Sequence, residues 1–548
     1  MPRFLSSAHL SLAAGFILAS CTYASSARAE DHSQQVDQIF AAFNRPGSPG
    51  CSVGIIRSGT FLYRKTYGEA SLELGVPLSP GSVFYVGSIS KQFTAASVVL
   101  AAEEGSLSLD EDVRKYIPEL PDYGHKITPR QMLNQTSGLR DFFSLIYFSG
   151  HDAADFNSPA ELLKLIAHQR GLNNPPGDEW VYSNTNYFLL GVVLERATKK
   201  TLAQFAEENI FRPLGMTHTR FYDDASAVVP GRVPAYYPGK DGNFLVGWST
   251  TYSIVGGGGL MTTVDDLLKW DDNFYSNRLG KGNLLRELQT PGVLNGGKHT
   301  MYGMGLMLEN YRGLPVVEHD GSLFGYRAEI LRFPSQKFSV ICLCNVSEGD
   351  PDLRSRQVAD LYLKELLQPN ATAASPTSKI FPDPTGFAGQ YFDPHAFAIF
   401  AFTAADGNLQ WGQAMQRKSA NQFYNFMGDL ITFQARGNSM KATWERNGQV
   451  LYIGERLGEF HLSDSELKEF VGDYRSGEVD GEFQIALEQG QLVLKNGNNP
   501  PIKLAPIAKN EFNAEGSLVI VFHREAGKVS GLVASAPEAR GIEFKRTR

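Results

Sequence analysis

A change in composition at residues 368–386 divides the chain into two parts that cannot share one fold class. Four prolines interrupt a run rich in Ala, Ser and Thr, which is the composition of an interdomain linker. The part before it mixes helical and strand patterns, whereas the part after it has short strand patterns separated by Gly, Asn and Asp turns. Since 548 residues are too many for one hydrophobic core, we expect an α+β domain at residues 30–368, a linker at 369–386 and β-modules beyond it.

Strand patterns lie at both ends of the α+β part. Residues 50–56 and 60–67 predict a hairpin, and strand patterns return at 304–308, 327–333 and 338–345. The helical patterns fall between them, at residues 85–104, 161–168, 187–198 and 267–275, the last with Thr263 as its N-cap. This order predicts an antiparallel sheet flanked by helices.

The second part contains an internal repeat. Phe-Ala-Gly-Gln-Tyr at residues 387–391 matches Phe-Val-Gly-Asp-Tyr at residues 470–474, and each copy is followed by a Gly-x-Leu strand start, at 407–409 and 490–492. Each copy begins a segment of fewer than 90 residues. The repeat therefore predicts two small antiparallel β-barrel modules, at residues 387–465 and 466–548.

The N-terminus has the pattern of an export signal. A positive residue, Arg3, precedes a short apolar run at 10–19, and Ala-Arg-Ala at 27–29 has the form of a cleavage site. We expect a signal peptide at residues 1–29 and a periplasmic or secreted protein. The alternative is the lipobox-like sequence at 18–21, which would leave a lipidated Cys21 and provide the only expected membrane contact. Mass spectrometry of the mature N-terminus distinguishes the two.

The net charge argues against a nucleic-acid partner, and the cysteines argue against a disulfide framework and a zinc site. The net charge is -7 and no basic stripe occurs, so we expect no nucleic-acid partner. Beyond the signal region, Cys51, Cys342 and Cys344 make an odd set, which is a poor disulfide framework. We interpret Cys342 and Cys344, which lie on one predicted strand, as small core residues, and we expect no metal and no cofactor because no Cys/His cluster has zinc spacing.

Ser88 and Lys91 are the first candidates for chemistry. Three residues apart on the predicted helix 85–104, they share one face, and Ser88 lies in the first turn, where free N–H groups favour an oxyanion. A lysine with a lowered pKa can activate the serine hydroxyl. Ser465 and Lys468 repeat the spacing, but they start no long helix and we interpret them as surface residues.

Two further motifs have side chains or backbone groups suited to a hydrolase site. Tyr182 and Asn184 lie on a loop entering a helix, where the phenol can transfer protons and the amide can bind a substrate amide. His319 and Gly321 lie just before a strand, and glycine there allows close approach of a substrate backbone. The N–H of Ser322 is a candidate second oxyanion donor. Separately, the apolar residues 142–148 are interpreted as core packing, with a pocket wall as the alternative.

Together, these motifs resemble the penicillin-recognising serine hydrolases, which have Ser-x-x-Lys and two later elements. Tyr182-Ser183-Asn184 is similar to the second element of class C β-lactamases and their peptidase and esterase relatives. His-Asp-Gly at 319–321 replaces Lys-Thr-Gly, which favours peptidases or esterases over a dedicated β-lactamase. Runs at 87–95, 135–141, 213–216 and 257–263 also look like family motifs, and the resemblance spans about residues 38–367.

The resemblance implies a function and a site. Ser88 would form an acyl-enzyme, Lys91 and Tyr182 would transfer protons, and the N–H groups of Ser88 and Ser322 would bind the oxyanion. Asn184, His319 and Gly321 would complete the substrate site. Which of Lys91 and Tyr182 is the acylation base stays open.

Within the family, the layout with two C-terminal β-modules most resembles bacterial D-aminopeptidases. In those enzymes a loop of the last module reaches toward the active site, and the corresponding turn here, residues 496–501, is short. This turn departs from the D-aminopeptidase pattern, so the resemblance does not carry over their exopeptidase specificity. The layout as a whole implies a serine hydrolase acting on small or short-peptide amides with D-residues, as D-aminopeptidases and DD-peptidases do. A carboxylesterase or β-lactamase of the same fold is the alternative, and a non-catalytic ligand-binding sensor is an alternative of another class. The sequence does not predict the oligomeric state.

Overall fold

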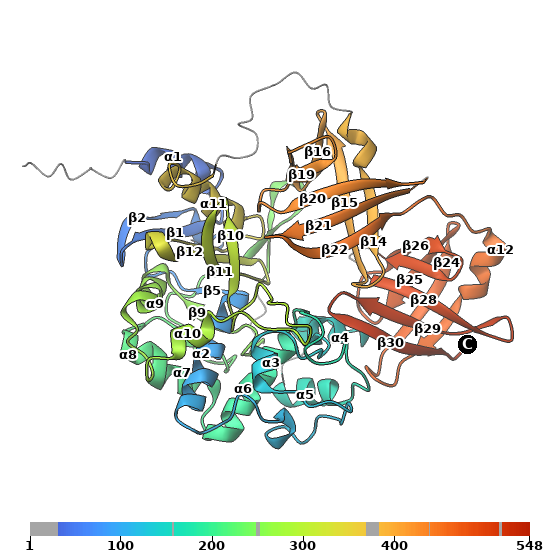
Figure 1. The fold of residues 1–548 in the computed structure, drawn as a ribbon, viewed down its shortest axis with the longest axis horizontal. Helices are drawn as coiled ribbons and strands as arrows, with labels where there is room; N and C mark the ends of the chain where they lie inside the picture. The colour runs from blue at the N-terminus through green and yellow to red at the C-terminus, as the bar shows by residue number, and fades with distance from the viewer. Residues whose placement is uncertain (1–30, 156–157, 248–251, 369–382, 438, 515–517) are drawn as a thin grey trace, which may run out of the picture.

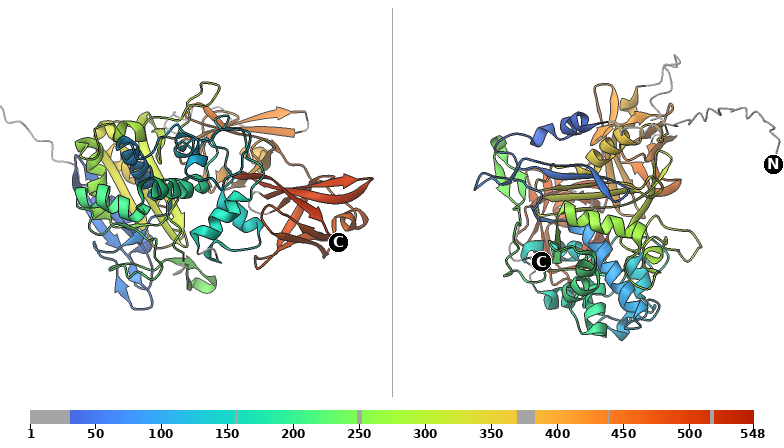
Figure 2. Two further views of the ribbon diagram at one scale, coloured as in Figure 1. Left: turned by 90° about the horizontal axis from the view of Figure 1, so that it is seen from below. Right: turned by 90° about the vertical axis from the view of Figure 1, so that its left-hand side faces the viewer.

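The computed structural model describes residues 31–155, 158–247, 252–368, 383–437, 439–514 and 518–548 (Figure 1). The expected signal peptide, Cys21 and residues 369–382 of the expected linker lie outside the described residues. An α+β region comes first in the chain, and two β-structures follow it. Figures 1 and 2 show both β-structures on the same side of the α+β region.

A six-stranded antiparallel sheet organises the α+β region, with the order β10-β11-β12-β13-β1-β2. The N-terminal hairpin therefore pairs with the last strand of the region, which confirms an antiparallel sheet built from both ends of the segment. The strands are β1 (Cys51–Arg57), β2 (Thr60–Tyr67), β10 (Met307–Tyr311), β11 (Leu314–Leu323), β12 (Tyr326–Phe333) and β13 (Phe338–Cys344).

Helices cover both faces of this sheet, and strand β13 shows why. Its side chains alternate between faces: Val340 and Cys342 join an apolar cluster with α1 (Ser33–Ile39) and α11 (Pro351–Tyr362). Ile341 and Leu343 join the larger cluster on the other face, with α2 (Ser90–Glu103), α6 (Asn184–Thr198) and α9 (Val264–Ser276). Every residue of β13 is buried, which explains its continuous apolar sequence.

Local sequence signals set helix ends in this region. Thr263 caps α9 by accepting a hydrogen bond from the N–H of Asp266, as predicted. None of the described helices has both the length and the apolar composition needed to cross a bilayer. Other elements of the α+β region include η2 (Gly87–Ile89), α3 (Pro129–Leu133), α4 (Phe142–Phe148), α5 (Pro159–Ala167), α7 (Leu202–Ala206), α8 (Arg212–Leu214), α10 (Leu284–Leu288), β5 (Phe84–Tyr85), β6 (Arg220–Phe221) and β9 (Leu260–Thr262).

The cysteines differ from the expectation. Cys51 and Cys344 form a disulfide between β1 and β13, whereas Cys342 is a free, buried thiol. The expectation that these cysteines form no disulfide is therefore wrong for Cys51 and Cys344, and the interpretation as a small core residue is confirmed for Cys342. The two partners are 293 residues apart in sequence and become neighbours only through the strand register that pairs them. The odd number of cysteines therefore could not predict whether a disulfide forms.

The second part of the chain forms two antiparallel β-structures. The first is a nine-stranded half-barrel in the order β17-β16-β15-β14-β22-β21-β20-β19-β18, and the second is a closed eight-stranded barrel of β23 to β30. The half-barrel strands are β14 (Gly389–Asp393), β15 (Ala398–Ala405), β16 (Asn408–Trp411), β17 (Gln413–Ala414), β18 (Gln416–Arg417), β19 (Gln422–Tyr424), β20 (Leu430–Arg436), β21 (Ser439–Arg446) and β22 (Gln449–Arg456). The barrel strands are β23 (Gly472–Arg475), β24 (Glu482–Glu488), β25 (Gln491–Asn496), β26 (Ile502–Ala508), β27 (Glu511–Ala514), β28 (Leu518–Glu525), β29 (Lys528–Ala536) and β30 (Ala539–Arg546), preceded by α12 (Asp464–Leu467).

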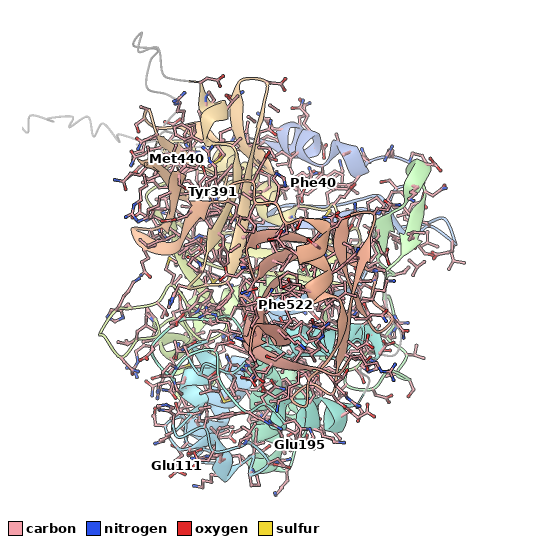
Figure 3. The ribbon with its side chains drawn as sticks, turned by 90° about the vertical axis from the view of Figure 1, so that its right-hand side faces the viewer. Phe40, Glu111, Glu195, Tyr391, Met440 and Phe522 are labelled. Carbon is pink, nitrogen blue, oxygen red and sulfur yellow. A yellow bond between two sulfur atoms is a disulfide. The ribbon has the colours of Figure 1, made fainter. Side chains whose placement is uncertain are left out.

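The sequence repeat has a structural basis. The Tyr391 hydroxyl donates to the carbonyl oxygen of Phe387 at 2.8 Å, and the Tyr474 hydroxyl donates to that of Phe470 at 2.7 Å. Each tyrosine is fully buried and fixes the entry into the first strand of its β-structure. Figure 3 shows Tyr391 among the half-barrel strands and Phe522 among the barrel strands.

Both β-structures pack against the α+β region. On the barrel side, a buried ion pair joins Arg140 to Glu478 at 2.7 Å, and the ring of Phe148 packs edge-on against Phe483. On the half-barrel side, Arg446 pairs with Glu309 at 2.8 Å. Because buried ion pairs need both partners, these contacts tie the C-terminal modules to the segment that carries the candidate site.

Candidate active site

The structure brings Ser88 and Lys91 together where the α+β region begins its first long helix. Ser88 lies in the single 3₁₀ turn η2, and Lys91 lies in the first turn of α2 that follows it. The Nζ of Lys91 is 3.0 Å from the Oγ of Ser88. Lys91 is fully buried, whereas Ser88 is partly exposed. The hydroxyl is therefore accessible to a substrate, and the amine contacts it from the protein interior.

Two fixed oxygen atoms hold the amine of Lys91 in place. Its Nζ lies 2.7 Å from the side-chain oxygen of Asn184 and 2.7 Å from the carbonyl oxygen of Gly257. Burial lowers the pKa of Lys91 to about 7, against the opposing effect of Asp141 and Asp320. A neutral amine has two N–H groups and one lone pair. With both N–H groups directed to Asn184 and Gly257, the lone pair is left to accept the proton of Ser88.

Tyr182 completes the predicted trio. Burial raises the pKa of its phenol well above the ordinary value, Tyr302 raises it further, and a hydrogen bond with Ser88 lowers it. Lys91 also lies 4.8 Å from the centre of the Tyr182 ring. Because its pKa is raised, the phenol stays protonated at neutral pH, which suits it to donate a proton to a leaving group rather than to take one from Ser88.

Asp141 belongs to the site, although the sequence argument gave it no role. It caps α4 by accepting from the N–H of Phe143, and its other carboxylate oxygen accepts from the backbone N–H and the side-chain amide of Asn184, at 2.5 and 2.9 Å. Asn184 therefore holds Lys91 through its oxygen and Asp141 through its nitrogen. An Asp before an apolar helical run is a recognisable N-cap signal, but its link to Asn184 depends on the fold.

His319 lies on β11 and is buried, with both ring nitrogens engaged. Its Nδ1 lies 2.7 Å from the carbonyl oxygen of Asp320, which can only accept, so Nδ1 carries the proton. Its Nε2 is therefore unprotonated and accepts a hydrogen bond from the hydroxyl of Tyr302, at a distance of 3.0 Å. Burial lowers the pKa of His319 to about 4, so the ring is neutral. The ring of His319 also contacts the ring of Tyr182, with 6.3 Å between ring centres. Tyr302, the partner of His319, is not part of any motif that could be recognised in the sequence.

Gly321 allows β11 to lie directly against the turn that carries Ser88. A Cβ at position 321 would lie 2.0 Å from the carbonyl oxygen of Val86 and 3.0 Å from the amide nitrogen of Ser88, and a Cβ at Gly87 would lie 2.6 Å from the nitrogen of Ser322. Gly321 thus allows η2 to lie close against β11. The sequence predicts a different role for this glycine, the close approach of a substrate backbone. It also places the N–H groups of Ser88 and Ser322 in one region.

Replacing Gly321 by alanine is expected to lower kcat/KM by about 10²- to 10³-fold, the loss typical of one displaced oxyanion donor. The added methyl group collides with rigid backbone, so η2 and β11 must separate. Steady-state kinetics measures the effect, with Gly458→Ala as the control because a Cβ there meets nothing within 4 Å. Near-normal activity of Gly321→Ala at a normal folding yield would contradict this arrangement of the two N–H groups.

A small apolar pocket opens beside Ser88 and Asn184. Its walls include Phe142, Phe143 and Leu323, which explains part of the apolar run at residues 142–148. The other members of that run, Leu145, Ile146 and Phe148, lie in the core. The segment thus serves both of the roles considered from the sequence. The remaining apolar lining comes from Tyr85, Tyr252 and Ile254.

The sequence and the fold are similar to those of known proteins. A family model described as Beta-lactamase matches residues 36–363. A D-aminopeptidase of Brucella melitensis biotype 2 (strain ATCC 23457) is 24% identical over 524 residues, which cover 91% of this chain and 96% of that protein.

Two solved structures show the same fold. An octameric penicillin-binding protein homologue from Pyrococcus abyssi is 22% identical with a TM-score of 0.55, covering 85% of this chain and 98% of that chain. A D-amino acid amidase from Ochrobactrum anthropi SV3, complexed with L-phenylalanine amide, is 22% identical with a TM-score of 0.50, covering 61% of this chain and 99% of its own.

Proposed function

The chain belongs to the beta-lactamase family of penicillin-recognising serine hydrolases, and from this premise we propose that it hydrolyses amides or short peptides of D-amino acids through an acyl-enzyme on Ser88. The observation that carries the proposal is the contact of 3.0 Å between Ser88 and a buried Lys91 whose pKa is about 7. The Ser-x-x-Lys of Ser465, on α12, and Lys468, just after it, lacks that burial, since both residues are exposed.

Acylation follows from the contacts of Lys91. The neutral amine takes the proton of Ser88 as Oγ forms a bond to the substrate carbonyl carbon. The N–H groups of Ser88 and Ser322 stabilise the oxygen as it becomes negative. The bond to the leaving nitrogen then breaks, and Tyr182 donates its proton to that nitrogen. The ammonium of Lys91 reprotonates the phenol, so that no net charge is left in the site.

Deacylation reverses these roles with water as the nucleophile. The neutral Lys91 and Tyr182 pair takes a proton from the water, which attacks the ester of Ser88. The proton returns to Oγ as the acid product leaves. Asn184, oriented by Asp141, keeps Lys91 in place throughout.

The stereochemical preference rests on the relatives. The D-aminopeptidase match extends over nearly the whole chain, including both β-structures, and a structural neighbour is a D-amino acid amidase. The pocket beside Ser88 is about 20 Å³ and is lined in part by Phe142, Phe143 and Leu323, so it suits only a small uncharged side chain on the acyl residue. His319 stands where Lys-Thr-Gly β-lactamases have lysine, and as a neutral ring it offers no cation for the carboxylate of a β-lactam.

The disulfide supports the proposal that the protein works outside the cytoplasm. Disulfides such as Cys51–Cys344 persist in oxidising compartments and are rare in the cytosol. This agrees with the export signal expected at residues 1–29, and D-amino-acid amides and peptides of the cell envelope would be accessible there.

A substrate panel tests the function. With D-alanine amide, L-alanine amide, p-nitrophenyl butyrate and nitrocefin, we expect the highest kcat/KM for D-alanine amide and at least about a tenfold preference over the L-amide, equivalent to ~1.4 kcal/mol. A higher value for the butyrate or for nitrocefin would favour the carboxylesterase or β-lactamase alternative. Complete inactivity, with no labelling of Ser88 by a fluorophosphonate probe, would favour a ligand-binding sensor.

A further inference from the structure

A cavity of about 600 Å³ lies where the α+β region meets both C-terminal β-structures. One wall comes from residues 178–182 and 294–301 of the α+β region. The half-barrel supplies a second wall, and the turn between β29 and β30 supplies a third. The catalytic mechanism proposed above uses none of these walls except Tyr182, which lines the cavity.

The half-barrel presents aromatic rings to this space. Trp411 and Trp444 meet edge to face with 4.7 Å between ring centres, and Tyr452 packs against Trp444 at 6.0 Å. Trp411 and Tyr452 are partly exposed, so their surfaces are available to a ligand. From the α+β region, Trp180 also lines the cavity, and its buried indole N–H has no hydrogen-bond partner among the described residues.

The two arginines that line the cavity are each paired with carboxylates. Arg446 pairs with Glu309 and Asp429, and Arg540 pairs with Glu179. An aromatic wall with paired charges favours a neutral, flat group over a strongly charged one, because aromatic rings attract other rings at offset or edge-to-face geometry.

The position of Tyr182 indicates which half of the substrate the cavity takes. A general acid must lie within hydrogen-bond reach of the nitrogen that it protonates. The leaving group of the amide is therefore beside Tyr182, on the side of the 600 Å³ cavity. The small apolar pocket, which contains Ser88 and Asn184 in its walls but not Tyr182, lies on the acyl side.

We propose that this cavity is the leaving-group subsite, and that it takes an amino-acid residue with an aromatic side chain directly after the scissile amide. The proposal rests on the proposed function and extends it: the preferred substrates are peptides whose second residue is aromatic, rather than simple primary amides. It also gives the half-barrel a role, since Trp411 and Tyr452 both come from that structure.

Two substrates with the same acyl group test the subsite. D-Alanine amide releases ammonia and leaves the cavity empty, whereas D-alanyl-phenylalanine amide places a ring in it. Trp411→Ala and Tyr452→Ala are each expected to lower kcat/KM for the dipeptide amide about tenfold, within the range of one lost aromatic contact, and to leave the value for D-alanine amide within about twofold. The matched control is Tyr424→Ala, since Tyr424 is a partly exposed half-barrel aromatic that lines a different cavity.

The outcomes separate the two proposals. An equal loss on both substrates, or no loss on either, would overturn the subsite, and circular dichroism of each variant shows whether folding contributes. If the wild type cleaves neither amide, the proposed function fails, and the subsite is then measured with benzyl and methyl butyrate. A loss in Trp411→Ala confined to the benzyl ester supports the subsite, and an equal loss on both esters rejects it.

Discussion

Ser88→Ala is expected to lower kcat by about 10⁶-fold, the scale on which serine hydrolases lose activity with their nucleophile. Without Oγ no acyl-enzyme forms, and only the oxyanion N–H groups and substrate binding remain to accelerate attack by water. Folding is expected to be unaffected, because Lys91 keeps its contacts with Asn184 and Gly257 when the hydroxyl is removed. Steady-state kinetics on D-alanine amide and thermal unfolding measure the two effects separately.

The chain provides a matched control for this variant. Ser465 has the same spacing to Lys468 as Ser88 has to Lys91, but both residues are exposed. Ser465→Ala should retain full activity and full labelling by a fluorophosphonate, while Ser88→Ala should not be labelled. Substantial activity left in highly purified Ser88→Ala would show that another group is the nucleophile, and the proposed acyl-enzyme would have to be abandoned.

Features encoded by neighbouring residues were predictable from the sequence. The Thr263 cap of α9, the hairpin of β1 and β2 and the two copies of the Phe-x-Gly-x-Tyr motif each depend on a few adjacent residues, and each is confirmed. The Ser-x-x-Lys spacing likewise predicts the contact between Ser88 and Lys91, because a helical turn brings residues three apart together.

Strand β11 escaped prediction for a physical reason. It buries Glu318 and His319, and buried polar residues break the apolar alternation that marks a strand. Their burial is tolerated because Glu318 pairs with Arg356 and His319 bonds to Tyr302 and Asp320. Arg356 and Tyr302 lie 38 and 17 residues away from Glu318 and His319 in the sequence, so the strand and the roles of these two residues appear only in the folded chain.

The contribution of the C-terminal barrel to the site was hidden for the same reason. The turn that corresponds to the D-aminopeptidase active-site loop, residues 496–501, docks on the end of α4 through Asn496 and the carbonyl of Tyr147. A different turn lies closer to the site, where the carbonyl oxygen of Glu538 accepts from the N–H of Asp141 at 2.8 Å. Asp141 in turn orients Asn184. The barrel therefore supports the residue that positions Lys91, which no local motif could indicate.

The second large effect concerns Lys91. Lys91→Ala is expected to lower kcat/KM by about 10³-fold, within the range for loss of a general base, whereas Lys164→Ala, an exposed lysine on α5, should have no effect. In the wild type the amine must be neutral to accept the proton of Ser88. Because the pKa of Lys91 is about 7, kcat/KM should rise as the pH increases through 7 and level off above it. A profile already flat between pH 5 and 9 would contradict Lys91 as the base.

Tyr182→Phe separates the base from the acid. The phenol stays protonated across this range because its pKa is raised. Its removal should therefore lower kcat/KM at every pH without shifting the rise near pH 7, which is due to Lys91. The loss should depend on the leaving group, being largest for amides and smaller for p-nitrophenyl butyrate, since nitrophenolate departs without a proton. If Lys91 and Tyr182 share one proton path, Lys91→Ala combined with Tyr182→Phe should lose little more than Lys91→Ala alone. Fully multiplicative losses would instead mean that the two groups act independently, each with its own proton route.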